Sequence, residues 1–465
     1  MVWPVCVFRL PPDAPASEPT IEYAKEEGME MRRTMLLLAS MALTLLVASG
    51  LALVAGVGSA GAQSSVVGPG ESIQKAINAA DPGDTIVVKG VHREDVAIRK
   101  NGIKLRGEDA VIEAPPKSEA DSRCSRLFGS PEGICVLGEV DIHNGKVTGP
   151  RVSDVTISGF TIRGFTKGPS IDLLGTRDAT ATKNRVLVGS GPIDVDLSVG
   201  NKIISNVVRD PVGGGINLQK DRDVTVAGND VQGSDENAFS MQKGTDVTVE
   251  GNDFTDNVFG MVVIRSTGTR ILSNDVSHSD LVGIFVFGPK KQSNNAKIVG
   301  NHISGGPWGI FVENAHGGSV TGNQVHDNCA GMFFEAFKDE PVSGFEVSGN
   351  TVADNTRSCG GQNFGRKFSG IGIALLGASG MEVKADHISG NVPSGPTPIS
   401  GGVVVSKDPY FRGTTFGGTQ KPRNNSVVAN DFGRNRPDIF WDKSGSGNRF
   451  VGNLCNTSVP TRLCN

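Results

Sequence analysis

The sequence predicts an all-β fold, a single-stranded parallel β-helix of about twelve coils with a capping helix at its N-terminal end. Three observations predict it. Glycine supplies 62 of 465 residues while Tyr supplies 2 and Trp 3, and glycine mixed with Val and Ile indicates short strands and tight turns. A Gly-Asn phrase recurs at a regular interval from residue 150 onward. The apolar residues around it alternate with period two, as in strands, and not with the period of a helix.

The charge balance excludes two classes of protein. Lys and Arg number 45, Asp and Glu number 49, and the net charge is −4. A basic nucleic-acid-binding protein and an acidic disordered chain are both inconsistent with these values. We therefore expect no nucleic-acid partner, and we expect a monomer.

Residues 1–62 are predicted to be an upstream extension followed by a signal peptide. A basic start at Arg32 and Arg33 precedes an apolar run over 35–57, and small residues end at Ala62. These are the parts of a secretory signal, so we expect cleavage after Ala62 and secretion. The alternative is an uncleaved membrane anchor, because the apolar run is long enough to span a bilayer. Residues 63–465 are then the β-helix domain.

The first element of this domain is an amphipathic helix around 71–80. Its apolar face consists of Ile73, Ala76, Ile77 and Ala80. A helix laid across the first coil covers the open end that every solenoid must protect. Short strands are expected after it, at Thr85–Lys89, Asp95–Ile98 and Ile103–Arg106.

The repeated coils follow. The asparagine of the Gly-Asn phrase, with one aspartate in its place, recurs mostly every 22 or 23 residues, and the longer intervals are insertions. A coil of this length accommodates three short strands that pair in parallel with the coils above and below. The side chains are then expected to stack in a ladder at one bend. The positions are Asn184, Asn206, Asn229, Asn252, Asn274, Asn301, Asn323, Asn350, Asp386, Asn430 and Asn453.

Six cysteines remain once Cys6 is set aside with the upstream extension, and an even number in an exported chain predicts three disulfides. Proximity in sequence favours Cys124–Cys135 and Cys455–Cys464. Cys329 and Cys359 occupy the same bend on neighbouring coils, where equivalent Cα atoms lie about 4.8 Å apart, within disulfide range. The sequence contains no CxxC motif or His-x-His pair, so we expect no zinc or redox site. We interpret His302 and His326, near the ladder bend, as turn residues and not as metal ligands.

The cap phrase SIQKAINAADPGDTIVVKG and the Gly-Asn coils resemble secreted right-handed parallel β-helix proteins of the pectin-lyase-like superfamily, in particular PbH1-repeat, NosD-like proteins. The resemblance covers about 71–113 and 150–455. It implies a right-handed helix and a substrate groove along the sheet made by the Gly-Ile-x-Val strands. It does not choose an activity, because the superfamily includes polysaccharide lyases, glycoside hydrolases, epimerases, tailspikes and proteins without assigned activity.

Alternation along those strands predicts two clusters of outward side chains. The first cluster contains both acidic and basic residues. Its carboxylates could hold Ca²⁺, and one of its basic residues could remove the proton from the carbon beside a uronate carboxylate. The alternative is a solvated polar face without a site. The predicted calcium ligands are Asp172, Asp194 and Asp196, and the basic residues are Lys220, Lys243 and Arg265.

The second cluster is Glu313 and Glu335 on neighbouring coils. Two carboxylates about 4.8 Å apart would form an acid and a base, and aromatic faces beside them could stack on sugars. The alternative is a Phe-lined patch covered by long loops. The aromatic side chains are Phe285, Phe287, Phe311, Phe333 and Trp308.

These patterns predict a secreted protein that acts on or binds an acidic polysaccharide or cell-surface glycan, as a polysaccharide lyase or a glycoside hydrolase if it is an enzyme. The alternative is a non-catalytic extracellular or envelope β-helix. The glutamate pair is the preferred site, because insertions at 354–370 and 406–420 are expected to rise on both sides of it.

Overall fold

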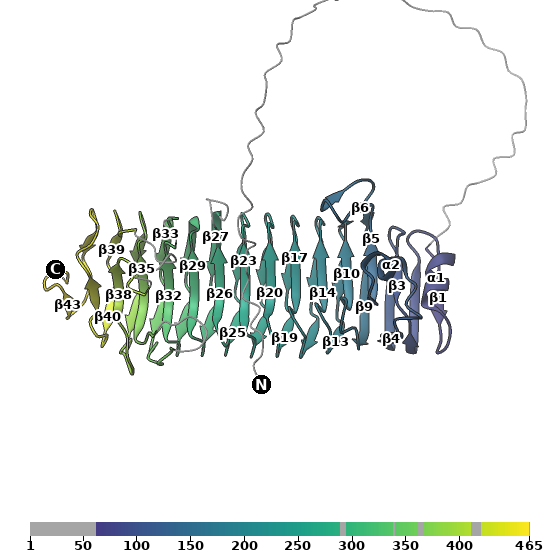
Figure 1. Cartoon of the computed structure of the whole chain (residues 1–465), viewed down its shortest axis with the longest axis horizontal. Coiled ribbons are helices and arrows are strands. Elements are labelled where there is room, and N and C mark those ends of the chain that lie inside the picture. Colours follow the sequence, from purple (N-terminus) through teal and green to yellow (C-terminus); the bar gives the residue numbers. More distant parts are fainter. Residues whose placement is uncertain (1–61, 289–293, 338–339, 361–366, 411–419, 465) are drawn as a thin grey trace, which may run out of the picture. The chain divides into compact units, whose positions relative to one another are not determined.

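The computed structural model describes residues 62–288, 294–337, 340–360, 367–410 and 420–464, which all belong to one compact unit, Ala60–Asn465. The predicted signal peptide lies outside the described residues. No helix among them is long and apolar enough to cross a membrane. The fold is the predicted parallel β-helix, with successive coils stacked side by side (Figure 1).

One face of the stack is a parallel sheet of 14 strands. The Gly-Ile-x-Val segments form its central strands, as expected. Its strands are β3 (Val96–Ile98), β5 (Ile134–Leu137), β10 (Ile171–Leu174), β14 (Ile193–Asp196), β17 (Ile216–Gln219), β20 (Asn237–Gln242), β23 (Phe259–Ile264), β26 (Val282–Phe287), β29 (Trp308–Glu313), β32 (Ala330–Glu335), β35 (Ile371–Leu376), β38 (Gly401–Ser406), β41 (Ile439–Trp441) and β43 (Ser458–Val459).

The other two faces form a continuous sheet of 25 strands, which folds at the asparagine bend. The first coils contribute β1 (Ser64–Val67), β2 (Thr85–Arg93), β4 (Lys104–Glu113) and β9 (Thr156–Arg163). The strands before the bend are β12 (Thr180–Thr182), β15 (Lys202–Ile204), β18 (Thr225–Ala227), β21 (Thr248–Glu250), β24 (Arg270–Leu272), β27 (Asn294–Val299), β30 (His316–Thr321), β33 (Ser343–Ser348), β36 (Glu382–Lys384), β39 (Ser426–Val428) and β42 (Arg449–Val451). Those after it are β13 (Arg185–Leu187), β16 (Val207–Arg209), β19 (Asp230–Gln232), β22 (Asp253–Thr255), β25 (Asp275–Ser277), β28 (His302–Ser304), β31 (Gln324–His326), β34 (Thr351–Ala353), β37 (His387–Ser389) and β40 (Asp431–Gly433).

The solenoid has about 16 turns, more than the twelve or so that the sequence predicted. The ladder asparagine marks a coil only from Asn184 onward, whereas strands β1 to β10 already build coils without it. Counting these asparagines therefore underestimates the coils at the N-terminal end.

The core consists of inward side chains that stack on their equivalents in the next coil. Ile216, Phe239, Met261 and Ile284 are in register along the 14-stranded sheet, and all four are fully buried. Each such side chain contributes about 1.5–3 kcal/mol by leaving water. The stacking explains why an apolar residue recurs at the same place in each coil.

The predicted asparagine ladder is present. The Nδ2 of Asn229, for example, donates to Oδ1 of Asn252 at 2.9 Å and to the carbonyl of Ile203 at 2.8 Å. A second ladder, not predicted, follows five residues later in several coils, and Asn328, Asn355 and Asn391 are three of its rungs. The five-residue spacing in the sequence could have shown it.

The N-terminal cap is helix α1 (Ile73–Ala79), which lies at the first coils in Figure 1 and buries Ile73 and Ile77. Ser72 caps it, and the carboxylate of Glu94 accepts from the backbone N–H of Ile73 at 2.6 Å. The predicted strands after the helix exist, and β2 and β4 extend further than expected.

Residues 113–150 hold elements that the sequence did not predict. They are helix α2 (Arg123–Phe128) and the antiparallel hairpin of β6 (Val140–Asp141) and β7 (Lys146–Val147). A short pairing joins β8 (Val152–Ser153) to β11 (Thr176–Arg177).

All three predicted disulfides are formed: Cys124–Cys135, Cys329–Cys359 and Cys455–Cys464. The Cα atoms of Cys329 and Cys359 are 5.9 Å apart, as expected for equivalent bends on neighbouring coils.

Candidate functional site

The outer face of the 14-stranded sheet divides into three sections. At its N-terminal end Ala97, Leu137 and Leu174 form a small apolar cluster with the Cys124–Cys135 disulfide, beside α2 and the β6–β7 hairpin (Figure 1). At its C-terminal end the outward side chains are buried in a second apolar cluster. Between them lie the outward residues of β14, β17 and β20, which are polar. We call these the open section; they are Asp194, Asp196, Asn217, Gln219, Ser240 and Gln242.

A line of hydrogen bonds runs across the open section from coil to coil. The hydroxyl of Ser240 donates to Oδ1 of Asn217 at 2.7 Å, and Nδ2 of Asn217 donates to Oδ1 of Asp194 at 2.8 Å. Asp194 is in register with Asp172 on the preceding coil. The parallel register thus places the aspartates of two coils side by side and fixes the orientation of Asp194.

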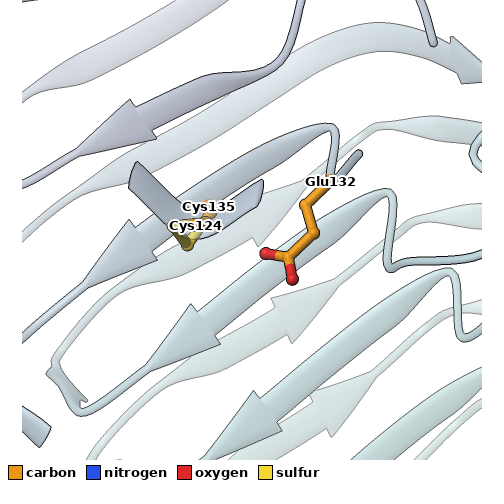
Figure 2. Close-up of side chains that lie close together, drawn as sticks. All are labelled: Cys124, Glu132 and Cys135. Atoms are coloured by element: carbon orange, nitrogen blue, oxygen red, sulfur yellow. A yellow bond between two sulfur atoms is a disulfide. The ribbon is translucent and has the colours of Figure 1, made fainter. Parts of the chain in front are cut away.

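Asp172 is buried, with 4% of its surface exposed, and the charge of the neighbouring Glu132 adds to the rise that burial causes in its pKa. Glu132, exposed by only 2%, precedes β5 and lies beside the Cys124–Cys135 disulfide (Figure 2). Its Oε2 and the Oδ1 of Asp172 have no hydrogen-bond partner within the described part of the chain. Sequence reasoning missed Glu132 because it lies outside the repeat, where no register predicts its direction.

Burial raises the pKa of each of these carboxyl groups by a different amount. Loss of hydration raises the pKa of Asp194 to about 8, although the hydrogen bond from Asn217 opposes the rise. Loss of hydration raises the pKa of Asp196 to about 6, and the charge of Lys220 limits this rise. The pKa of Glu132 rises to about 7, and that of Asp172 lies well above its ordinary value, mainly through burial. At neutral pH Asp194 therefore holds a proton while most Asp196 is ionised.

Three basic residues lie where the strands of the open section and of β23 end. Lys220, Lys243 and Arg265 each follow the last residue of their strand and adopt positive φ angles of 59°, 57° and 51°. They therefore line one edge of the face, one per coil. Nζ of Lys220 also donates to the carbonyl of Gly145 in the hairpin at 3.2 Å, which ties the hairpin to the open section.

The geometry does not gather the three predicted calcium ligands. Among the described residues, one group of three His, Cys, Asp or Glu side chains brings its ligand atoms within 4.8 Å of one another, and it consists of Cys124, Glu132 and Cys135. Its two sulfur atoms are joined in a disulfide and cannot act as thiolate ligands. Asp172, Asp194 and Asp196 are not such a group, and a calcium ion at these aspartates stays a prediction.

The structure places Glu313 and Glu335 in register on β29 and β32, on the predicted face. Glu335 is fully buried, whereas Glu313 is partly exposed. The middle parts of the predicted flanking loops, 361–366 and 411–419, lie outside the described residues.

The aromatic side chains around the glutamates are packed against one another and against the loops. Phe333 is 1% exposed, and its ring centroid lies 5.4 Å from that of Phe311 and 6.3 Å from that of Tyr410. The ring of Trp308 stacks at 4.5 Å on Phe368. The two phenylalanines of β26, Phe285 and Phe287, are partly exposed. The rings of Phe311, Phe333 and Trp308 are therefore buried and offer no open face to a sugar.

Solved structures to which the chain is similar include the A-module of the mannuronan C-5 epimerase AlgE6 from Azotobacter vinelandii. It is 18% identical over 84% of this chain and 94% of its own, with a TM-score of 0.49. The catalytic unit of a GH87 α-1,3-glucanase from Streptomyces thermodiastaticus strain HF3-3 is 14% identical over 86% of this chain and 70% of its own, with a TM-score of 0.50. At these identities the likeness concerns the fold alone. No curated protein matches the sequence. The family model for the right handed beta helix region matches residues 145–292 and 274–432, and the chain belongs to this family.

Proposed function

We propose that the open section binds an acidic polysaccharide and cleaves it, with Asp194 as the proton donor and Asp196 as the base. The observation that carries this proposal is the pair itself. Two carboxyl groups project from one face of β14, and their pKa values are separated to about 8 and about 6. A pair of titratable groups whose environments separate their pKa values is the arrangement that acid–base catalysis at neutral pH requires.

The spacing of the pair favours hydrolysis. Residues two apart on a strand project from the same face, with their Cα atoms about 7 Å apart. Carboxyl groups separated by roughly 6.5–9.5 Å leave room for a water molecule between the base and the sugar, as in inverting glycoside hydrolases. In this scheme Asp194 protonates the leaving oxygen, and ionised Asp196 takes a proton from the attacking water.

The surroundings of the pair supply contacts for a charged glycan. Lys220, Lys243 and Arg265 line one edge of the face at the spacing of the coils, about 4.8 Å. Charged donors at this edge can bind the carboxylates of successive uronate residues. The amides of Gln219 and Gln242 can bind hydroxyl groups. A glycan is therefore expected to lie along the stack, across the strands.

The proposal includes export. Three disulfides are formed in the described residues, and disulfides persist in oxidising compartments. N-terminal sequencing of the exported protein should begin at Gln63 if the signal is cleaved after Ala62. A protein that keeps its N-terminal segment and sediments with membranes would favour the uncleaved anchor instead.

The test is a panel of uronate polymers and neutral glucans incubated with the mature protein. Hydrolysis forms new reducing ends without ultraviolet absorbance, whereas β-elimination forms unsaturated ends that absorb. We expect reducing ends from a uronate polymer, and a loss of at least a hundredfold in Asp194→Asn and Asp196→Asn.

The matched control is Asp253→Asn, an exposed aspartate on β22 of the other sheet, which should keep full activity. Absorbing products would show β-elimination and refute the hydrolytic scheme. Uronate binding without any product would support the non-catalytic alternative.

A further inference from the structure

Two histidines face each other on the 25-stranded sheet, away from the open section. His302 is the first residue of β28 and His326 the last residue of β31, so both lie on strands and not in turns as the sequence suggested. These strands are neighbours, with Ser304 in register with His326. The rings lean toward each other across one strand spacing, with centroids 4.8 Å apart and their Nε2 atoms 2.7 Å apart. The two side chains are 42% and 33% exposed, so solutes reach them.

A carboxylate lies near the other nitrogen of each ring, and that of Asp327 is within hydrogen-bond distance of His326. Oδ2 of Asp327 lies 2.7 Å from Nδ1 of His326, and Oδ2 of Asp275 lies 3.5 Å from Nδ1 of His302. An ionised carboxylate only accepts hydrogen bonds, so it favours the ring tautomer that carries its proton on Nδ1. Both Nε2 atoms then present lone pairs to each other at hydrogen-bond distance. Two lone pairs at this distance repel each other unless a positive charge lies between them.

We propose that His302 and His326 bind a divalent transition metal ion, with Zn²⁺ as the ion that fits best. Neutral imidazole nitrogen is a preferred zinc ligand, with a bond of about 2.0–2.1 Å. Two such bonds at a tetrahedral angle separate the nitrogen atoms by about 3.3 Å, so the two nitrogen atoms need to move apart by about 0.6 Å from their present 2.7 Å. Carboxylates that accept from the second nitrogen of ligating histidines are the usual support of zinc sites, and Asp275 and Asp327 occupy that place.

The two protein ligands leave the other coordination positions of the ion to water or to a group from a partner molecule. A hard ion such as Ca²⁺ is not expected here, because it prefers oxygen ligands. The site is separate from Asp194 and Asp196, which lie on the other sheet, so it stands whether or not the chain cleaves glycans.

The chain contains matched histidines for comparison. His387 lies 3.1 Å from Asp431 and His278 lies 3.7 Å from Asp256, so each also has a carboxylate at Nδ1. What distinguishes His302 and His326 among the described histidines is that their imidazole rings are in contact with each other. A histidine with a carboxylate but without a facing ring offers one ligand, so His387 should bind Zn²⁺ far more weakly.

The experiment is calorimetric titration of the metal-free mature protein with Zn²⁺ at neutral pH. The wild type should bind one equivalent, and His302→Ala and His326→Ala should each lower the affinity at least tenfold. His387→Ala should leave the affinity unchanged, and Asp327→Asn should weaken it by about 10–100-fold. Circular dichroism of each variant shows whether the fold is kept, which we expect because both rings are on the surface.

Three results would overturn the inference. The wild type could show no saturable binding up to millimolar Zn²⁺, in which case the facing nitrogen atoms share a proton only. Both single variants could keep the wild-type affinity, which would place the metal elsewhere. His387→Ala could weaken binding as much as His302→Ala, which would show non-specific coordination by surface histidines.

Discussion

Replacing Asp386 by asparagine should stabilise the protein at neutral pH. Asp386 occupies one rung of the asparagine ladder and is 1% exposed. Its Oδ1 accepts from the backbone N–H of Asn350 at 2.7 Å and from Nδ2 of Asn350 at 2.8 Å. Its Oδ2 has no hydrogen-bond partner among the described residues. At the same position each asparagine of the ladder has an amide nitrogen, which donates to a backbone carbonyl of the preceding coil, as that of Asn350 does. The carboxyl group therefore leaves one position of the ladder unsatisfied.

The magnitude follows from the pKa of this group. Burial is the main cause that raises the pKa of Asp386 from 3.8 to about 6, and the hydrogen bonds from Asn350 oppose it. A pKa difference of one unit between the folded and unfolded states corresponds to about 1.4 kcal/mol, so ionisation destabilises the fold by about 3 kcal/mol above pH 6. Below pH 4 the carboxyl group is protonated and the fold keeps this stability, which is lost as the pH rises through 6. Asparagine cannot ionise, so Asp386→Asn keeps the stability at every pH.

The assay is urea unfolding of the wild type and Asp386→Asn, with disulfides intact, at pH 4 and pH 7. At pH 7 the free energy of unfolding of Asp386→Asn should exceed that of the wild type by most of the 3 kcal/mol. At pH 4 the difference between the two proteins should be smaller. Asp280→Asn, at an exposed position, should change neither value by more than about 0.5 kcal/mol. A difference that is absent at pH 7, or that is the same at both pH values, would refute this account of the ladder.

Three further changes test other parts of the structure. Loss of the Cys329–Cys359 bond in the double alanine variant should lower the free energy of unfolding by about 2–4 kcal/mol, because the bond closes a loop over a sequence separation of 30 residues; an unchanged urea midpoint would contradict this. Phe333→Ala should lower it by about 3–5 kcal/mol if the outer aromatic cluster is a true core, and a change under 1 kcal/mol would show that its cover is open in solution. Lys220→Ala should move the acidic limb of the activity profile to higher pH, because Lys220 holds down the pKa of Asp196; a limb that does not move would remove Asp196 as the base.

The fold could be predicted because each coil repeats one pattern. The recurrence of residues such as Asn229 and Asn252 fixed the period, and the alternation in Val247 and Val249 fixed the strands. The same register placed Cys329 beside Cys359, so the pairing followed from geometry. Where the repeat is absent, in residues 113–150, neither α2 nor the β6–β7 hairpin was predicted.

The candidate site was predicted only in part. Alternation showed correctly that Asp194 and Asp196 project from the outer face of their sheet, but it could not show which sections of that face are covered. The burial of Phe333 depends on side chains such as Phe368 and Tyr410, which the chain brings in from segments without periodicity. The burial of Glu132 likewise depends on how residues 113–150 fold. Burial decides both the pKa values and the accessible face, so the preferred site moved from the glutamates to the aspartates.

The most direct test of the central claim is the pH dependence of kcat/KM for cleavage of the uronate polymer that the panel identifies. If ionised Asp196 is the base and protonated Asp194 the acid, the profile is a bell with limbs near pH 6 and pH 8 and a maximum near pH 7. Asp194→Asn should lower kcat/KM at least a hundredfold and remove the alkaline limb. A wild-type profile that is flat between pH 6 and pH 8, or an alkaline limb that persists in Asp194→Asn, would contradict the assignment.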